Sequence, residues 1–125
     1  MISEKTYRFA VRIVKLCQLL RRDRNESIIS RQLERSGISI RANVTEGQQG
    51  QSRADFIAKL SIALKETSET KYWLELLYDT GYLTSKEFQS IHSDCIEIEK
   101  ILTSILKTTK KNTTGKGKTA SENTE

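Results

Sequence analysis

Apolar side chains recur every three or four positions along four stretches of the chain, which is the spacing that places them on one face of an α-helix. The stretches cover about residues 3–22, 25–47, 53–80 and 84–108, and short polar connectors separate them. Because short connectors join antiparallel neighbours, the pattern predicts an all-α, antiparallel up-down-up-down four-helix bundle. This bundle would occupy residues 1–108.

Local capping signals support these helix boundaries. Asn25 is a good N-cap for the second stretch, and Ser52 and Thr84 each precede an acid by three residues, which is the spacing of a capping box. Gly81 stands where a left-handed residue commonly ends a helix. These signals indicate four separate helices.

The fourth stretch carries its apolar residues in a heptad seam, which favours a left-handed bundle with crossing angles of about 20°. The seam residues are spaced 3-4-3-4-3: Phe88, Ile91, Cys95, Ile98, Leu102 and Ile105. From Thr109 onward no bulky apolar residue follows. Such a segment cannot bury enough apolar surface to offset the entropy lost on ordering, so a disordered Lys- and Thr-rich tail is predicted for residues 109–125.

A chain of 125 residues fits one domain, and the absence of proline and the low count of six glycines suit long helices. No apolar run approaches the roughly 20 residues that cross a bilayer, and the first residues lack the basic and apolar regions of a signal peptide. The two cysteines, Cys17 and Cys95, form no Cys-x-x-Cys pattern. We therefore expect a cytoplasmic protein with reduced thiols and no membrane association.

Positive charge is concentrated in the first half of the chain. Residues 1–62 hold 12 Lys and Arg against 6 Asp and Glu, whereas residues 63–108 hold 5 against 8. A basic stripe follows the first predicted helix and the turn after it: Lys5, Arg8, Arg12, Lys15, Arg21, Arg22 and Arg24. The stripe predicts contact with the phosphate backbone of RNA or DNA, and the alternative is an ordinary solvated helix face. No base-reading motif is visible, so such contact would involve backbone and shape.

The second half of the third predicted helix is apolar on more than one side. The residues concerned are Tyr72, Trp73, Leu76 and Tyr78. A helix of this kind is buried on two sides or meets another subunit. The pattern therefore predicts an oligomer interface, and the alternative is a central helix within a monomeric bundle.

The stretch from Gln32 to Gly47 is not fully explained by helix rules, because it adds small polar residues and an acid just before a terminating glycine. It closely resembles the signature of the bacterial four-helix-bundle family encoded in intervening sequences of large-subunit ribosomal RNA genes. The signature positions are Gln32, Arg35, Ser39, Asn43, Glu46 and Gly47. The resemblance implies subunits that assemble into a ring-shaped homopentamer, and a relation to the accessory variability protein of diversity-generating retroelements.

No catalytic constellation is visible in the sequence. Glu46 has no His, Cys or second acid at productive spacing. Asn43 and Glu46 are expected to make structural hydrogen bonds, and the alternative is contact with a partner subunit or ligand. His92 and Cys95 are three positions apart, but a single histidine leaves too few ligands for zinc, which needs at least three from the protein. We expect no metal, no cofactor and no enzymatic activity.

Two functions remain open at this point. The first is a non-enzymatic, homo-oligomeric protein that binds RNA or DNA through its basic surface. The alternative is an accessory or adaptor subunit that docks onto a reverse transcriptase or another nucleoprotein partner of a retroelement. The first predicts nucleic-acid binding by the purified protein alone, whereas an adaptor needs its partner.

Overall fold

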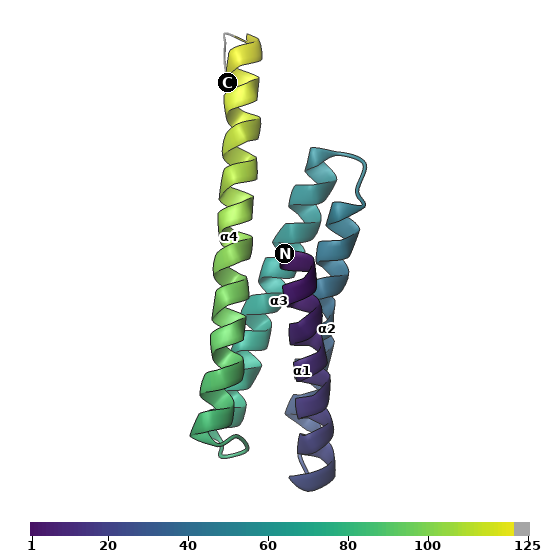
Figure 1. The fold of residues 1–125 in the computed structure, drawn as a ribbon, viewed down its shortest axis with the longest axis vertical. Coiled ribbons are helices and arrows are strands. Elements are labelled where there is room, and N and C mark those ends of the chain that lie inside the picture. The colour runs from purple at the N-terminus through teal and green to yellow at the C-terminus, as the bar shows by residue number, and fades with distance from the viewer. Residues whose placement is uncertain (122–125) are drawn as a thin grey trace.

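The computed structural model describes residues 1–121, with side chains described for residues 1–112. Four helices account for this part of the chain: α1 (Ile2–Asp23), α2 (Ile28–Gln48), α3 (Arg53–Asp79) and α4 (Ser85–Ser121). Consecutive helices run antiparallel and pack in sequence, α1 on α2, α2 on α3 and α3 on α4, while α1 and α4 touch only slightly (Figure 1). The predicted all-α four-helix bundle is confirmed.

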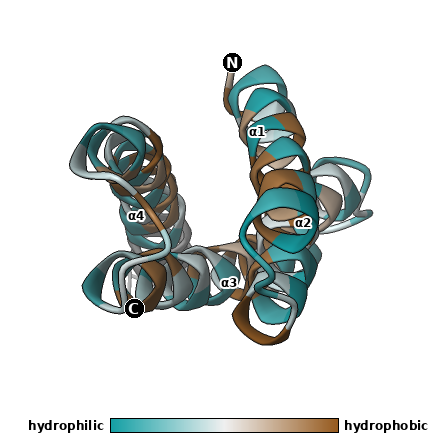
Figure 2. Cartoon of the chain, turned by 90° about the horizontal axis from the view of Figure 1, so that it is seen from below, coloured by the Kyte–Doolittle hydropathy of each residue, from teal (hydrophilic) through white to brown (hydrophobic). Residues whose placement is uncertain are grey.

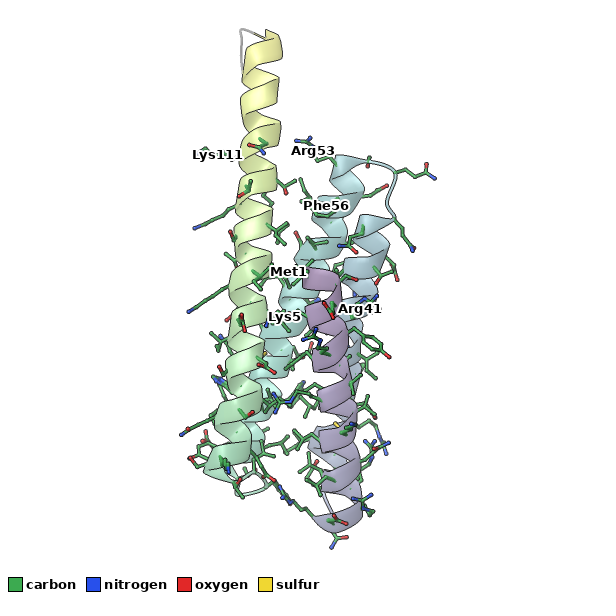
Figure 3. The ribbon with its side chains drawn as sticks, in the orientation of Figure 1. Met1, Lys5, Arg41, Arg53, Phe56 and Lys111 are labelled. Carbon is green, nitrogen blue, oxygen red and sulfur yellow. The ribbon has the colours of Figure 1, made fainter. Side chains whose placement is uncertain are left out.

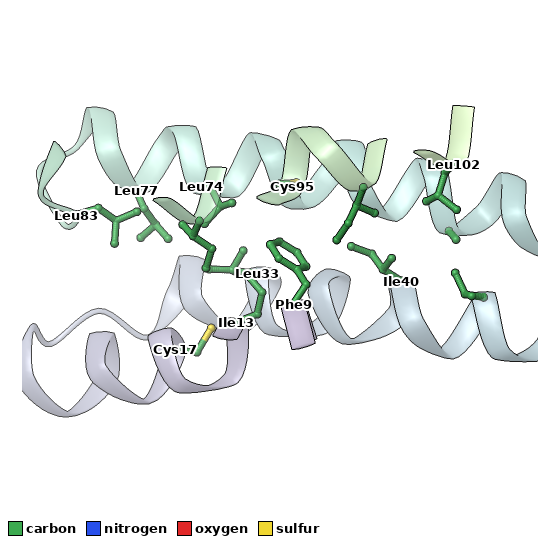
Figure 4. Packing of buried hydrophobic residues seen from close by; sticks show 14 of the residues in the cluster. Phe9, Ile13, Cys17, Leu33, Ile40, Leu74, Leu77, Leu83, Cys95 and Leu102 are labelled. Carbon is green, nitrogen blue, oxygen red and sulfur yellow. The ribbon is translucent and has the colours of Figure 1, made fainter. Parts of the chain in front are cut away.

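The core lies between the apolar faces of the four helices, and the polar faces turn outward (Figure 2). Side chains from all four helices interlock there, with Phe9, Ile13, Leu33 and Leu74 near its centre (Figure 4). The predicted seam of the fourth helix is buried at Ile91, Cys95, Ile98 and Leu102, whereas its last member, Ile105, is only partly buried. The buried apolar residues are Phe9, Ile13, Cys17, Leu20, Leu33, Ile40, Val44, Leu60, Ala63, Leu74, Leu77, Leu83, Ile91, Cys95, Ile98, Leu102 and Leu106.

The last helix is longer than the sequence predicted. The pattern placed its end near residue 108 and a disordered tail at 109–125, but the backbone is helical through Ser121. Among residues 1–112, whose side chains are described, Leu106 is the last buried apolar one. The extension therefore continues a helix that the core has already nucleated, in a stretch without proline. Residues 122–125 of the predicted tail lie outside the described residues. In Figure 1 the end of α4 extends well beyond the other three helices.

Most of the predicted capping signals are confirmed. Ser52 Oγ accepts a hydrogen bond from the Asp55 N–H at 3.1 Å, and Thr84 and Glu87 form a reciprocal capping box with bonds of 2.9 and 3.1 Å. Gly81 has φ +89°, and the N–H groups of Gly81 and Tyr82 bond the last carbonyls of α3. Glycine is suited to this position because it adopts a positive φ without strain.

The start of the second helix differs from the prediction. Asn25 is not its cap; it lies in the turn with φ 54°, a left-handed conformation that asparagine tolerates. The next residue supplies the cap, because the buried Glu26 carboxylate accepts the N–H groups of Ile28, Ile29 and Ser30 at 2.7–3.0 Å. A charged acceptor on three N–H groups satisfies the donors that a new helix leaves unpaired.

None of the described helices combines the length and apolar character needed to cross a membrane.

Candidate nucleic-acid interface

The predicted basic stripe of α1 lies mostly in ion pairs. Lys5 Nζ is 2.8 Å from a Glu97 carboxylate oxygen, and Arg12 Nη1 is 2.6 Å from Asp94, with Ser90 Oγ accepting a further bond at 2.9 Å. These acids come from α4, so the two residues join the helix pair that is otherwise in slight contact. The two ion pairs therefore connect α1 to α4, and the positive charges of Lys5 and Arg12 are balanced within the bundle.

The other arginines of the stripe are also paired. Arg8 bonds Glu4 one turn earlier at 2.5 Å, Arg22 bonds Asp23 at 3.0 Å, and Arg21 reaches Glu34 of α2 at 3.1 Å. Within the described residues, only Lys15 of the seven predicted binding residues has no carboxylate partner. The stripe is therefore largely neutralised, and whether it contacts nucleic acid stays a prediction.

Arg24 makes the best-formed of these pairs. Its guanidinium holds the Glu87 carboxylate with two bonds of 2.8 Å and also donates to the Tyr82 carbonyl at 2.8 Å. Hydrogen bonding from Arg24, and next from the Thr84 backbone, lowers the pKa of Glu87 to about 2. This clamp fastens the end of α1 to the start of α4.

Uncompensated positive charge gathers instead on the second half of α4. We call Lys100, Lys107, Lys110 and Lys111 the α4 lysine ridge; all four are exposed and have no carboxylate partner among the side chains described. The sequence holds no Asp or Glu between positions 100 and 121. The nearest acid before the ridge, Glu99, is held by Lys71 at 3.1 Å. The sequence itself carries this signal, as lysines that no acid accompanies after position 99 until Glu122.

Two shallow hollows adjoin the α4 lysine ridge. One, of about 450 Å³, is lined by Glu99, Lys100, Thr103, Ser104 and Lys107. The other, of about 380 Å³, lies where the start of α3 faces α4 and is lined by Arg53, Phe56, Thr109 and Asn112. In Figure 3, Arg53 and Phe56 extend from α3 toward α4 at the level of Lys111. Hydroxyls, amides and cations predominate over acids here, which suits a polyanion.

The signature residues of α2 act within the fold. Arg35 bridges to α3, where it pairs with Glu69 and lies 3.6 Å from Glu66. Glu46 pairs with Lys59 of α3 at 2.9 Å. These contacts fasten α2 to α3, in agreement with a structural role for Glu46.

The polar residues between them bond their own helix. Ser39 Oγ donates to the Arg35 carbonyl at 2.7 Å, and Asn43 Nδ2 donates to the Ser39 carbonyl at 2.9 Å. Asn43 thus makes its side-chain hydrogen bond within α2. Gln32 is exposed on the surface of α2.

Two glycines of this stretch allow close helix approach. A Cβ on Gly37 would lie 2.8 Å from Ile13 of α1, and a Cβ on Gly47 would lie 2.8 Å from Leu60 of α3. Both distances are shorter than carbon atoms tolerate. The small residues of α2 therefore serve packing against two different neighbours.

The predicted interface residues of α3 divide between packing and exposure. Tyr78 stacks on Phe88 of α4 at 4.4 Å, and Trp73 is partly buried against the core. Tyr72 remains 54% exposed, with Leu76 half-buried one turn further on. Because α3 packs on both α2 and α4, part of its broad apolar surface is explained within one subunit.

The described residues form no cluster of metal ligands. No three His, Cys, Asp or Glu side chains among them gather where they could hold a metal ion. His92 instead contacts Glu75 at 2.9 Å and stacks on Phe88. Burial raises the pKa of the Cys17 and Cys95 thiols to about 12, so neither forms a reactive thiolate near neutral pH.

Comparison with known proteins identifies the family to which this four-helix bundle belongs. The sequence model of the 23S rRNA-intervening sequence protein family matches residues 1–104. The chain belongs to this family. A crystal structure from Bacteroides thetaiotaomicron VPI-5482, described as a protein with unknown function from the S23 ribosomal protein family, is 52% identical with a TM-score of 0.84. The match covers 86% of this chain and 99% of that one.

No curated protein matches the chain. The family description names no reaction and no ligand. Membership therefore agrees with the four-helix bundle, and the function of this 23S rRNA-intervening sequence protein has to be inferred from the residues on its surface.

Proposed function

We propose that this chain is a non-enzymatic, homo-oligomeric protein that binds the backbone of RNA or DNA, chiefly through the α4 lysine ridge. The observation that carries the proposal is the distribution of charge after internal pairing. The carboxylates of α4 that precede the ridge are engaged by Lys5, Lys71 and Arg12, whereas the ridge cations are exposed and unpaired within the described residues.

The spacing of the ridge suits a phosphate chain. Lys100, Lys107 and Lys111 are separated by seven and then four residues, which places them on one helix face roughly 10 Å and 6 Å apart. A duplex carries one charge per about 1.7 Å of its axis, so several phosphates lie within reach of such a face. Lysine presents a point charge and reads no base, so binding should tolerate any sequence.

The α1 stripe is a weaker contributor in this proposal. A cation that already pairs with a carboxylate must lose that partner, or share it, to hold a phosphate. Among the stripe residues that the structure describes, Lys15 alone has no carboxylate partner. Replacing Arg12 would also break its contacts with Asp94 and Ser90, so variants of α1 confuse binding with stability.

The test is the salt dependence of binding to RNA and DNA duplexes of unrelated sequence. Each lost phosphate contact should reduce the slope of log K against log salt by about 0.7–0.9. Lys107→Gln with Lys111→Gln should therefore lower the slope by about 1.4–1.8 per subunit bound, equally for every sequence. The matched control is Lys65→Gln with Lys86→Gln, which removes the same charge from two exposed lysines outside the ridge.

The outcomes separate the candidate functions. A smaller slope for the ridge variant alone supports the proposal. Equal decreases in slope for both variants would show that binding depends on net charge alone, and the α4 lysine ridge would not be a specific binding surface. If the purified protein binds no nucleic acid at low salt, the proposal fails and an adaptor that docks onto a reverse transcriptase or other nucleoprotein partner takes its place.

A further inference from the structure

We propose that α1 carries a second, latent surface for a phosphate backbone, and that two acids of α4 block it by pairing with its cations. The inference rests on the proposed binding of nucleic acid, and it concerns a different surface from the α4 lysine ridge. Lys5, Arg12 and Lys15 form what we call the latent surface, and the blocking acids are Asp94 and Glu97. The contact between the two helices is therefore autoinhibitory.

The acids of α4 follow the cations of α1 in antiparallel order. Glu97 Oε1 lies 2.8 Å from Lys5 Nζ, and Asp94 Oδ2 lies 2.6 Å from Arg12 Nη1. The two helices stand apart in the end-on view of Figure 2, so these pairs bridge elements that otherwise touch only slightly. Two carboxylates beside two cations present the same negative charge that phosphates of a nucleic-acid strand would present there. The acids thus imitate the ligand.

Both pairs are exposed enough for a phosphate to replace the carboxylate without movement of a helix. The Glu97 side chain is 58% exposed, and the Arg12 and Asp94 side chains are 40% and 39% exposed. Pairs of this kind contribute little to stability, so their exchange costs little. The Arg24–Glu87 pair differs, because Arg24 makes three hydrogen bonds of 2.8 Å, two of them to the same carboxylate. We therefore assign that pair to the fold and the other two to the blocked surface.

A hollow beside Arg12 gives a phosphate group room to bind. It has a volume of about 200 Å³ and is lined by residues of α1 and of the first half of α4: Arg12, Lys15, Leu16, Glu87 and Ile91. A water molecule takes about 30 Å³ of liquid, so a group several times larger fits. Glu87 is already neutralised by Arg24, and Lys15 has no carboxylate partner among the described residues. Once Asp94 releases Arg12, both basic side chains of the hollow are available to hold a phosphate.

The spacing of the latent surface suits a nucleic-acid strand that runs along α1. Lys5 and Arg12 are seven residues apart, or about 10 Å along the helix axis, and Lys15 follows three residues later. One strand of a duplex carries a phosphate per about 3.4 Å of axis, so a single strand brings phosphates to all three cations. No acid lies between Lys5 and Arg22 in the sequence. The acids that neutralise Lys5 and Arg12 therefore come from α4.

The experiment removes the blocking acids and measures binding to the same RNA and DNA duplexes of unrelated sequence. The released variant, Asp94→Asn with Glu97→Gln, keeps the size of both side chains but removes their charge. Two released cations should add two phosphate contacts, so the slope of log K against log salt should become steeper by about 1.4–1.8 per subunit bound. Between about 50 and 200 mM salt, the loss of affinity should grow by about tenfold.

Two further variants separate local release from net charge. Asp55→Asn with Asp79→Asn removes the same two negative charges from exposed positions of α3, and its slope should stay close to that of the wild type. Adding Lys5→Gln and Arg12→Gln to the released variant restores the net charge of the wild type, and the slope should return to the wild-type value. If circular dichroism shows that the released variant has lost its helices, Glu97→Gln alone takes its place and should steepen the slope by about 0.7–0.9.

An equal slope for the released variant and its charge-matched control would overturn the inference. So would a steeper slope that persists in the variant with four substitutions, because the gain would then not depend on Lys5 and Arg12. Failure of the proposed function gives a different result. A wild type that does not bind, beside a released variant that does, rejects binding through the α4 lysine ridge and supports the latent surface. An effect of the ridge variant without any gain in the released variant does the reverse.

Discussion

The Arg24–Glu87 clamp gives a prediction whose size follows from its geometry. Replacing Glu87 by Gln keeps an oxygen for the Thr84 N–H and the capping box, but removes the charge and one of the two acceptors that hold the guanidinium. The change therefore isolates the tie between the end of α1 and the start of α4. Because α1 and α4 share few other contacts, little can compensate for its loss.

The magnitude can be bounded in two ways. A Glu87 pKa of about 2 in place of 4.5 corresponds to at most about 3 kcal/mol of folding free energy. The Glu87 side chain is 33% exposed, so solvent screening reduces this figure to about 1–2 kcal/mol. Charge-assisted, two-bond pairs of arginine with a carboxylate fall in the same range. We expect Glu87→Gln to lower the free energy of unfolding by about 1–2 kcal/mol at pH 7.

The pH dependence identifies the cause. The folded-state pKa of Glu87 lies below the unfolded value, so its stabilisation is present above the unfolded pKa of 4.5 and is lost as pH falls toward about 2. Urea unfolding of wild type and variant should therefore differ at pH 7 and converge as the pH falls through this window. Other acids titrate in both proteins and cancel in the difference.

Glu97→Gln is the control for this experiment. It breaks a single contact, with Lys5 at 2.8 Å, from a carboxylate that is 58% exposed, and should cost no more than about 0.5 kcal/mol. The reasoning is refuted if the Glu87 variant is as stable as wild type at pH 7, or if the difference between them does not change between pH 6 and pH 2.5.

Two further predictions concern packing and the thiols. Gly37→Ala places a Cβ 2.8 Å from buried Ile13, so urea unfolding should show a free energy of unfolding lower by about 1–3 kcal/mol. The control, Gln32→Ala on the exposed side of α2, should change this free energy by no more than about 0.5 kcal/mol. Similar values for the two variants would contradict the close approach of α1 and α2. Cys17 and Cys95 should not react with a thiol reagent at pH 8 in the folded protein, but both should react after unfolding; stoichiometric labelling of the native state would show that they are accessible.

Several features of the fold could be predicted because their causes are local. The spacing of apolar residues sets which face of a helix is buried, and a capping side chain acts within four residues of its own position. Ser52, Gly81 and Thr84 accordingly mark helix ends where the sequence placed them. The turn before α2 was predicted wrongly because Asn25 and Glu26 are both good acceptors, and only the backbone path decides which one faces the helix.

The ion pairs of Lys5 and Arg12 could not be predicted from sequence spacing. Between Lys5 and Arg22 the sequence has no acid, so the stripe suggests an unbroken positive surface. Its partners Asp94 and Glu97 lie more than 80 residues away along the chain and meet it only when α4 returns beside α1. A pair formed across such a distance leaves no periodic signal on either helix.

The sequence by itself determined that the chain forms four helices, which faces they bury and which family signature they carry, since these depend on side-chain periodicity and nearest neighbours. Only the tertiary structure decided which charges neutralise one another and which remain. Among the side chains that the structure describes, it left Lys107 and Lys111 without a carboxylate partner on the second half of α4, and Tyr7 and Tyr72 exposed on separate helices. Electrostatic pairing and surface exposure depend on distances between helices, which are fixed only when the bundle closes.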